Sequence, residues 1–442
     1  MTFADFNLTT PLLNALTERG YVRPTTIQAK AFSVVMSGKD VCGIAQTGTG
    51  KTFAYLLPAL RQWKYGKDRY PQILILVPTR ELVAQVVESV KELTPYMTVE
   101  VVGAYGGVNM KTQLAAIENG CDIVVATPGR LLDLAYNGAL KLKNIKKLVI
   151  DEMDEMLSLG FRTQLNNILD LLPVKRQNLL FSATITEDVE KLMDTYFNAP
   201  VIIEAAPTGT PLDNISQYDY SVPNFYTKIN LLKLLLTEDK DMTKVLVFVA
   251  TKRMADDVYE QLEPKFNEEM GVIHSNKDQN FRFNTVNQFQ AGTYRFIIAT
   301  DIIARGLDIS EVTHVINFDT PDIPENYIHR IGRTGRADKK GISITFTNEK
   351  EEAYKAAIEE LMNYKIPTLP LPDHLEISTE LTYDEQPKGN LKEIQLKIPK
   401  RENVGAAFHE QSAKRMKNPT KMKHSDKMKL KYKKPIKRKP KK

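Results

Sequence analysis

The most constraining feature of this chain is a short glycine-rich segment between an apolar run and an amphipathic stretch. The run Val41–Ile44 has the continuous hydrophobicity of a parallel strand buried on both faces, and residues 53–60 have helical spacing. Between them lie Ala45, Gln46, Thr47, Gly48, Thr49, Gly50, Lys51 and Thr52. A glycine-rich turn that leads from a strand into a helix predicts a phosphate-binding loop, because its backbone N–H groups and the helix N-terminus attract anions.

The residue types in this loop indicate what it would hold. Lys51 can reach the β- and γ-phosphates of a nucleotide, and the hydroxyl of Thr52 can bind Mg²⁺. The first position is Ala45 rather than the glycine of the general pattern. The alternative is a glycine-rich turn that only connects a strand to a helix.

Apolar runs alternate with helical patterns along most of the chain and predict an α/β fold with parallel sheets. In the first half these runs are 41–45, 73–77, 123–126, 148–150 and 178–181, and in the second half they are 245–249, 296–299, 312–318 and 342–346. A stretch rich in Pro, Gly and Thr separates the two halves. We therefore expect a leading segment at 1–30, a first domain at 31–205, a linker at 206–215 and a second domain at 216–370.

The positive charge of the chain is concentrated at its C-terminal end. Residues 414–442 contain 15 Lys or Arg and one acid, a net charge of +14, so that the rest of the chain carries a net charge of −8. Residues 371–442 are polar and then Lys-rich, with few aromatic residues, and are predicted to be disordered. Such a tail can bind nucleic acid through its charge, or it can serve only to keep the protein in solution.

The composition excludes several classes of protein. No apolar run approaches the roughly 20 residues that span a bilayer, and the N-terminus lacks the basic and apolar parts of a secretory signal. Cys42 and Cys121 are too few for a disulfide framework, and each lies in an apolar segment, as a small hydrophobic residue would. A cytoplasmic protein without membrane contact is predicted, and we expect a monomer.

Two adjacent carboxylates end the apolar run at 148–150. Ligands of open parallel sheets bind at the carboxyl ends of the strands, and Asp151 and Glu152 stand at such an end. Taken alone, an Asp-Glu pair at a strand end is commonly a solvated turn. Downstream of a phosphate-binding loop it points to catalysis, with Asp151 in the Mg²⁺ shell and Glu152 orienting and deprotonating the attacking water.

Three arginines separated by glycines occur in the second half of the chain, at Arg330, Arg333 and Arg336. They could form a surface charge cluster. If they belong to a second domain that closes on the phosphate-binding loop, they could instead act as arginine fingers, which accelerate phosphoryl transfer by about 10³–10⁵-fold. ATP turnover would then depend on domain closure.

Together these residues resemble the DEAD-box family of RNA helicases, over roughly residues 1–365. The resemblance implies two tandem RecA-like domains with parallel sheets. It also implies an adenine-reading element before the phosphate-binding loop, in which Gln28 hydrogen-bonds the adenine edge, Phe3 stacks on the ring and Arg23 lies in the same segment. Phe6 is an alternative to Phe3. An element of this kind favours ATP over GTP.

Other short segments follow in the order that the family has. As RNA-binding residues the resemblance implies Pro78, Thr79, Arg80, Gly107, Thr127, Gly129, Arg130, Thr300 and Asp301. As residues that couple hydrolysis to strand separation it implies Asp154, Ser182, Thr184 and His329. Asp308 is placed for the ribose of ATP, and Arg333 and Arg336 match the family's arginine fingers. Each segment is a weak signal alone, and their shared order and spacing carry the resemblance.

Two segments depart from the family's pattern. Met153 stands where the family has Ala, and its added volume would be absorbed by the core or would alter function. Residues 274–279 read His-Ser-Asn-Lys-Asp-Gln where the family usually has His-Gly-Asp-Leu-Ser-Gln. The second departure weakens the prediction of RNA contacts in the second domain.

The resemblance implies an enzyme that uses ATP and Mg²⁺, binds RNA largely without regard to sequence, and remodels short duplexes or RNA–protein complexes when its two domains close. The compact chain resembles bacterial members such as the RhlE-like group, which is associated with ribosome assembly and cold adaptation. The tail is then expected to contact RNA or ribosomal particles. Two alternatives stay open, an ATP-locked RNA clamp or annealing chaperone with slow turnover, and a DNA helicase with the same twin-domain engine.

Overall fold

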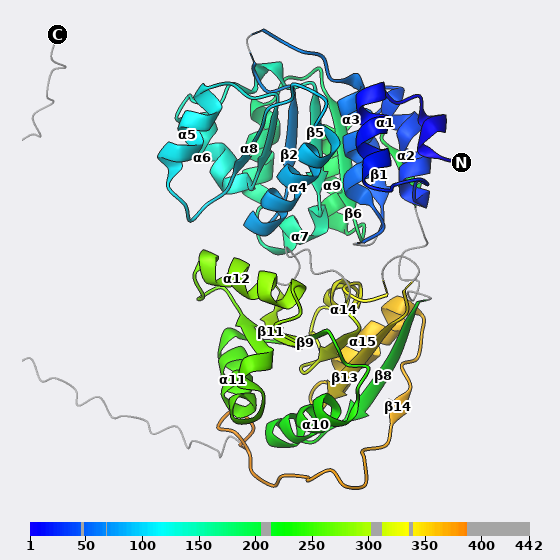
Figure 1. Cartoon of the computed structure of the whole chain (residues 1–442), viewed down its shortest axis with the longest axis vertical. Helices are drawn as coiled ribbons and strands as arrows, with labels where there is room; N and C mark the ends of the chain where they lie inside the picture. Colours follow the sequence, from blue (N-terminus) through cyan, green and yellow to red (C-terminus); the bar gives the residue numbers. More distant parts are fainter. Residues whose placement is uncertain (46–47, 68, 205–213, 302–311, 336–338, 387–442) are drawn as a thin grey trace, which may run out of the picture. The chain divides into compact units, whose positions relative to one another are not determined.

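The computed structural model describes residues 1–45, 48–67, 69–204, 214–301, 312–335 and 339–386. Residues 1–384 form one compact unit that contains two seven-stranded sheets (Figure 1). We call residues 1–204 the first lobe and residues 214–384 the second lobe. No helix in the described ranges is both long and apolar enough to cross a membrane.

The first lobe is built on a parallel sheet with the strand order β3-β4-β2-β5-β6-β1-β7. Its strands are β1 Val41–Ile44, β2 Ile73–Leu76, β3 Val101–Ala104, β4 Ile123–Ala126, β5 Lys147–Asp151, β6 Gln177–Ser182 and β7 Val201–Glu204. Its helices are η1 Phe3–Phe6, α1 Thr10–Glu18, α2 Thr26–Met36, α3 Lys51–Gln62, α4 Arg80–Leu93, α5 Met110–Glu118, α6 Pro128–Tyr136, η2 Leu142–Asn144, α7 Met153–Ser158, α8 Arg162–Leu171 and α9 Glu187–Tyr196. Because paired strands are parallel, their carboxyl ends lie along one edge of the sheet.

Alternating residues of each strand point to opposite faces of this sheet, and each face has its own core. Ile73 and Ile75 of β2 pack in one cluster with helices α1 to α4, whereas Leu74 and Leu76 pack in another with helices α6 to α9. Burial on both faces explains why the central residues of the interior strands are apolar. Met153 is fully buried in the second cluster at the start of α7, so its added volume is part of this core.

The second lobe repeats the plan with the strand order β10-β11-β9-β12-β13-β8-β14, again with parallel pairing. Its strands are β8 Ile215–Ser221, β9 Val245–Val249, β10 Met270–Ile273, β11 Phe296–Thr300, β12 His314–Asn317, β13 Gly341–Thr347 and β14 Thr368–Leu369. Its helices are α10 Phe225–Glu238, α11 Lys252–Phe266, η3 Asn267–Glu269, α12 Gln279–Gln290, α14 Pro324–Ile331 and α15 Glu352–Met362. Helices α10 and α11 pack in one apolar cluster, α12 in a second, and α14 with α15 in a third.

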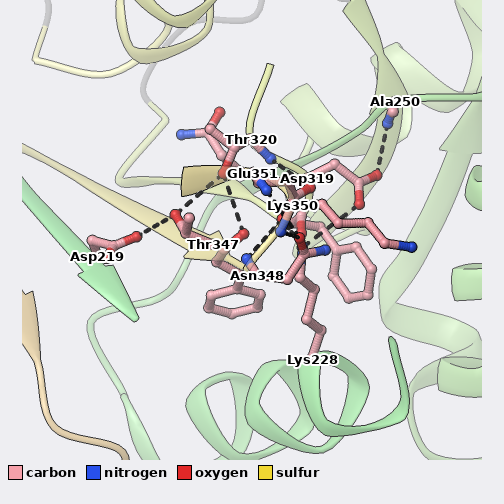
Figure 2. Close-up of polar contacts among 12 residues, drawn as sticks. Asp219, Lys228, Ala250, Asp319, Thr320, Thr347, Asn348, Lys350 and Glu351 are labelled. Atoms are coloured by element: carbon pink, nitrogen blue, oxygen red, sulfur yellow. Dashed lines mark hydrogen bonds and ion pairs between the residues drawn. The ribbon is translucent and has the colours of Figure 1, made fainter. Parts of the chain in front are cut away.

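A buried polar network ties α10 to the ends of β12 and β13 (Figure 2). Nζ of Lys228 lies 2.7 Å from Oε2 of Glu351 and 3.8 Å from Oδ1 of Asp319, and it also donates to the carbonyl oxygen of Phe318. Asp319 in turn accepts a hydrogen bond of 2.8 Å from the backbone N–H of Ala250. Burial raises the pKa of Glu351, and the charge of Lys228 opposes that shift. The lysine side chain is 3% exposed, so it acts as an internal cross-link rather than as a surface charge.

Replacing Lys228 by Met is expected to destabilise the second lobe by about 3 kcal/mol, because two buried carboxylates would lose their shared cation. Hydrogen exchange of the amides in β12 and β13 measures this change within the lobe. Lys350, which is exposed beside the network, provides the control, since Lys350→Met should change stability by less than about 0.5 kcal/mol. Equal amide protection in the two variants would contradict the role given to Lys228.

The predicted fold class is confirmed, because both lobes are α/β with parallel sheets and each predicted apolar run contains a strand. Two boundaries lie elsewhere than the sequence suggests. Strand β8 begins at Ile215, inside the predicted linker. Leu371 and Leu375 pack against the core of the second lobe, and the backbone N–H of Ser378 donates to Oγ1 of Thr227, so this lobe continues past residue 370. The predicted tail, from residue 387 onward, lies outside the described residues.

Candidate active site

The residues predicted to bind nucleotide lie at the carboxyl ends of three neighbouring strands. The glycine-rich loop follows β1, Asp151 ends β5, and Ser182 ends β6, which lies between the other two strands. Parallel sheets bind ligands at this edge, because loops and helix N-termini meet there. The topology therefore brings together segments that are more than a hundred positions apart in the sequence.

The glycines of the loop have conformations that few other residues adopt. Gly48 and Gly50 have φ values of 84° and 90°, in the left-handed region. A Cβ atom on Gly50 would also lie 2.5 Å from Nε2 of Gln28, which donates a hydrogen bond of 3.0 Å to the Gly50 carbonyl oxygen. Gln28 thus joins the predicted adenine-reading element to the phosphate-binding loop. Gln46 and Thr47 lie outside the described residues.

Lys51 is the observation in this loop that points most directly to a ligand. It is 6% exposed, and within the described part of the chain its Nζ atom has no hydrogen-bond partner. A buried ammonium group without hydrogen bonds is costly unless an anion satisfies it. Its charge also lowers the pKa values of Asp151 and Glu152 against the opposing effect of burial. The side chain therefore fits a phosphate group in the loop.

A cavity of about 700 Å³ opens in front of Lys51, within the size range of ligand pockets. Among its lining residues are Phe3, Arg23, Gln28, Gly48, Gly50, Lys51, Thr52, Asp151, Glu152 and Arg333, all of them predicted site residues. The cavity therefore unites the loop and the paired carboxylates of the first lobe with an arginine of the second lobe. It also includes Tyr21 and Phe53, whose rings meet edge-on 5.2 Å apart and which the sequence did not single out.

The N-terminal aromatic residues have different surroundings. Phe3 lines the cavity, whereas Phe6 stacks on Phe32 at 4.4 Å in the core. Phe3 is therefore the better candidate for stacking on a base. Gln28 also forms a capping box with Thr25, whose backbone N–H donates to its Oε1 atom at 3.0 Å. These contacts fix the amide orientation of Gln28 at the cavity wall.

Asp151 and Glu152 are both buried, and burial raises the pKa of each. For Glu152 the pKa rises to about 7, with Lys51 and Arg333 lowering it and Asp151 raising it further. Glu152 has a left-handed backbone conformation, with φ 54° and ψ 53°, at the N-terminus of α7. Such strain in a residue other than glycine commonly marks a functional site. A carboxyl group with a pKa near neutrality suits a general base.

Thr52 and Asp151 are the predicted metal ligands, and both face the cavity. The described residues contain no group of three or more His, Cys, Asp or Glu side chains that could hold a metal ion. Mg²⁺ keeps several waters and is commonly bound through one or two protein groups together with substrate phosphates. A hydroxyl and a carboxylate beside a phosphate-binding loop fit that preference.

The predicted coupling residues form one hydrogen-bonded group. Oδ2 of Asp154 accepts from the backbone N–H groups of Ala183 and Thr184, at 3.1 and 3.0 Å, and from the Thr184 hydroxyl at 3.0 Å. The Asp154 N–H donates to Oγ of Ser182, and Nε2 of His329 lies 3.8 Å from the same carboxylate. Burial pushes the pKa of Asp154 upward, but His329 and Lys51 outweigh it and the pKa is lowered. The carboxylate thus links the nucleotide site to both β6 and α14.

The arginines of α14 and the turn after it have distinct environments. Arg330 is fully buried, where Nε and Nη2 donate to Asp301 at 2.5 and 2.8 Å and the guanidinium lies 5.2 Å from the ring of Phe248. Arg333 is 4% exposed and lines the cavity. Arg336 lies outside the described residues, as does Asp308, so their predicted roles stay predictions. Both carboxylate oxygens of Asp301 are bonded to Arg330, which supports a positioning role and leaves the predicted RNA contact of Asp301 a prediction.

The predicted RNA-binding residues of the first lobe follow three neighbouring strands, β3, β4 and β2. Thr79 and Thr127 are the N-cap residues of α4 and α6 and are largely buried. Gly107, with φ 79°, packs so closely on the Arg80 guanidinium that a Cβ atom there would clash. Pro78 and Gly129 lie beside these caps, and Arg130 donates to Gln113 at 2.6 Å and to the Val108 carbonyl oxygen at 3.2 Å. Thr300, which is also buried, ends β11 of the second lobe.

One cluster of charged residues was not predicted. Oε1 of Glu81 lies 3.1 Å from Nη1 of Arg282 and accepts a 3.0 Å hydrogen bond from Gln279. Arg282 and Glu81 are 8% and 4% exposed in their side chains. Glu81 belongs to a segment that resembles an RNA contact of the family. The structure shows instead that its side chain is buried beside α12 and pairs with Arg282. No spacing in the sequence relates Glu81 to residues about two hundred positions away.

Comparison with known proteins shows the family of the chain. The model of the DEAD/DEAH box helicase family matches residues 25–192, and that of the helicase conserved C-terminal domain matches residues 227–338. The chain is 39% identical to the ATP-dependent RNA helicase RhlB of Pseudomonas syringae pv. tomato, over 84% of this chain and 96% of the relative. It is 37% identical to the DEAD-box ATP-dependent RNA helicase CshA of Geobacillus kaustophilus, over 84% of this chain and 79% of the relative.

Two solved structures share the fold over 84% of this chain. Dbp5 of S. cerevisiae bound to RNA and ADP BeF3 superposes with a TM-score of 0.76 and 29% identity, covering 95% of that chain. Mss116p bound to ssRNA and AMP-PNP superposes with a TM-score of 0.77 and 26% identity, covering 78% of that chain. Both lobes, in the order found here, are thus common to these proteins. The chain belongs to the DEAD-box family of ATP-dependent RNA helicases.

Proposed function

We propose that this chain hydrolyses ATP in the cavity between Lys51, Glu152 and Arg333 and uses the reaction to remodel RNA. The single observation that carries this proposal is that the two lobes line the same cavity, with Lys51 and Glu152 from the first and Arg333 from the second. Phosphoryl transfer depends mainly on positioning and on stabilising charge on the phosphate oxygens. A site shared by two lobes makes that positioning depend on how the lobes meet.

The residues of the chain divide the work of hydrolysis. Lys51 would bind the β- and γ-phosphates, Glu152 would orient the attacking water and take its proton, and Arg333 would stabilise charge in the transition state. Thr52 and Asp151 would hold Mg²⁺, which would offset the negative charge of the phosphates. The hydrogen bonds of Asp154 to residues 183 and 184 would pass changes at the phosphates to β6.

The RNA-facing residues support binding without sequence preference. Thr79, Thr127 and Thr300 offer hydroxyl groups, and Gly107 and Gly129 offer backbone N–H groups, both of which suit phosphates and sugars. Contacts to the ribose 2′-OH would separate RNA from DNA. Closure of the lobes would bend one strand and open a short duplex, and hydrolysis would release it.

ATPase stimulation by RNA and by DNA of the same sequence tests this function. We expect RNA to raise the ATPase rate and to be unwound, whereas DNA has little effect. Equal stimulation by DNA would favour a DNA helicase, and duplex release that lags far behind single-turnover hydrolysis would favour an RNA clamp or annealing chaperone. The names of the relatives and the titles of the solved structures give no support to either alternative.

The kcat/KM for ATP at saturating RNA is expected to fall as the pH drops below about 7. Only the ionised carboxylate of Glu152 can accept a proton, and burial raises its pKa to about 7. Because kcat/KM reports pKa values of the free enzyme, its logarithm should approach a slope of one on the acid side. The affinity for a non-hydrolysable ATP analogue over the same range is the control. A flat profile of kcat/KM would contradict this role of Glu152.

Deletion of the tail, residues 414–442, is expected to weaken RNA binding and leave the basal ATPase rate unchanged. If 6–10 of its charges meet phosphates, the affinity of the full chain should fall about 10³–10⁵-fold between 50 and 200 mM salt. The deletion should flatten this dependence. A salt dependence identical to that of the full chain would show that the tail does not contact RNA.

Finer assignments are also part of the proposal. The sequence resemblance supports membership of an RhlE-like subgroup, a role in ribosome assembly or cold-shock RNA metabolism, and contact of the tail with ribosomal particles. The resemblance and the composition also support a cytoplasmic location and a monomeric state. The relatives reported above carry the names RhlB and CshA rather than RhlE. Crosslinking of the protein to RNA in cells, followed by sequencing of the bound RNA, identifies the substrate.

A further inference from the structure

A second hollow, of about 370 Å³, lies in the first lobe where its strands begin. It is bordered by the segments that lead into β2, β5 and β6, which start at Ile73, Lys147 and Gln177. The nucleotide site and the predicted RNA contacts lie where these strands end. Strands of four to six residues separate the two edges by roughly 13–20 Å before any loop is counted. The hollow is therefore distinct from the active site.

The hollow is lined by positive charge. Its lining residues are Gly66, Lys67, Arg69, Tyr70, Gln72, Lys143, Asn144, Ile145, Lys146, Pro173 and Lys175, and none of these described residues is acidic. Of the five cations, only Arg69 has a carboxylate partner in the described chain, Glu100 at 3.4 Å. Lys146 donates instead to the neutral Oε1 of Gln72 at 2.8 Å. Like charges gathered around a concave surface raise the local concentration of anions.

One aromatic side chain, Tyr70, stands among these charges. The ring of Tyr70 lies 5.0 Å from Nζ of Lys141 and 6.0 Å from Nζ of Lys143, and its hydroxyl accepts a hydrogen bond of 3.3 Å from Lys141. Tyr65 and Val174, nearby in the sequence, are 59% and 99% exposed. Basic side chains that track a phosphate backbone beside exposed rings are the usual composition of single-stranded nucleic-acid sites. A surface that bound only small anions would have no need of the aromatic groups.

We propose that this hollow, together with Lys141, binds the phosphodiester backbone of RNA that extends beyond the segment gripped at the active edge. The chain belongs to a family that acts on RNA, and the charge and aromatic content of the hollow fit RNA better than an acidic polypeptide. All of its residues belong to one lobe, so binding here requires no closure of the lobes. The site therefore holds RNA in the absence of ATP and keeps a long substrate attached between cycles.

The test uses the full chain with Lys143, Lys146 and Lys175 each replaced by Glu. All three side chains are exposed, so the fold should be preserved. A matched control replaces three exposed lysines elsewhere, Lys91, Lys240 and Lys265, by Glu and makes the same change in net charge. Affinity is measured without nucleotide for a long structured RNA over a range of salt concentrations. Affinity for a short oligouridylate is measured with a non-hydrolysable ATP analogue.

The hollow variant should bind the long RNA roughly tenfold more weakly than the control variant, with a salt dependence flattened by about two to three phosphate contacts. Its binding of the short RNA with the ATP analogue should equal that of the control, which separates a failure of this proposal from a failure of the active site. Equal affinities of the two variants for the long RNA would overturn the proposal. A second result would also overturn it. If the unmodified chain bound polyglutamate, and the hollow substitutions abolished that binding without changing the affinity for long RNA, the surface would be a site for an acidic protein.

Discussion

Replacement of Glu152 by Gln is expected to lower the RNA-stimulated kcat for ATP by about 10²–10⁴-fold, the usual contribution of a general base. Gln has nearly the same shape as Glu, so the wall of the cavity should persist, but an amide cannot take the proton of the attacking water. ATP and RNA should still bind, because Lys51 and the predicted RNA-binding residues are unchanged. The protein is then expected to accumulate as a long-lived complex with ATP and RNA.

Three measurements separate loss of catalysis from loss of structure in this variant. Single-turnover hydrolysis reports the rate of the chemical step, steady-state hydrolysis reports kcat, and dissociation of labelled RNA in the presence of ATP reports the lifetime of the complex. Glu190→Gln, on an exposed position of α9, makes the same chemical change in the same lobe and should leave all three values unaltered. Normal turnover in Glu152→Gln would remove Glu152 from the reaction and leave the paired carboxylates as a metal-binding feature only.

How far the sequence predicts this fold depends on where each strand lies in its sheet. The interior strands β1, β2, β4, β5 and β6 each contain a continuous apolar stretch, because helices cover both of their faces, although β5 and β6 begin and end on polar residues. The strands that were not predicted lie at or next to the edges. Val101–Ala104 is only partly buried along most of its length, and Ile215–Ser221 alternates between buried and more exposed residues. Polar residues interrupt Ile215–Ser221, so a search for continuous apolar runs overlooks it. Val101–Ala104 has no polar residue, so this reason does not apply to it.

The site was predictable where a single segment carries the chemistry. The glycine-rich loop contains its own signal, and the Asp151–Glu152 pair gains its meaning from following that loop in the sequence. The structure places both at one edge of the sheet. Contacts between distant segments gave no such signal. The pairing of Asp301 with Arg330 and that of Glu81 with Arg282 depend on the fold, because each joins residues from different elements. The family resemblance marked Asp301 as an RNA contact, and the spacing of the arginines drew attention to Arg330, but neither showed that the two residues are partners.

The second large effect is expected at Arg333. Arg333→Ala should lower kcat by about 10³–10⁵-fold, the range attributed to arginine fingers. Its guanidinium lies at the wall of the cavity with Glu152, whose pKa it lowers. Because the residue comes from the second lobe, its loss should leave ATP binding by the first lobe largely intact. Arg333→Lys should restore little activity, since an ammonium group cannot make the planar, two-pronged contact of a guanidinium with phosphate oxygens.

Arg330, three positions earlier at the end of α14, is the informative comparison, because it has the same side chain but is fully buried and pairs with Asp301. Arg330→Ala would leave the buried carboxylate of Asp301 without its cation and should destabilise the second lobe by about 3–5 kcal/mol. The two variants should therefore differ in what they lose. Arg333→Ala should lower kcat and leave amide protection unchanged, whereas Arg330→Ala should lower amide protection in the second lobe. Arg253→Ala, whose side chain is 74% exposed, should affect neither. If Arg333→Ala instead kept its kcat, hydrolysis would not depend on the second lobe, and closure of the lobes could not be what couples ATP to RNA.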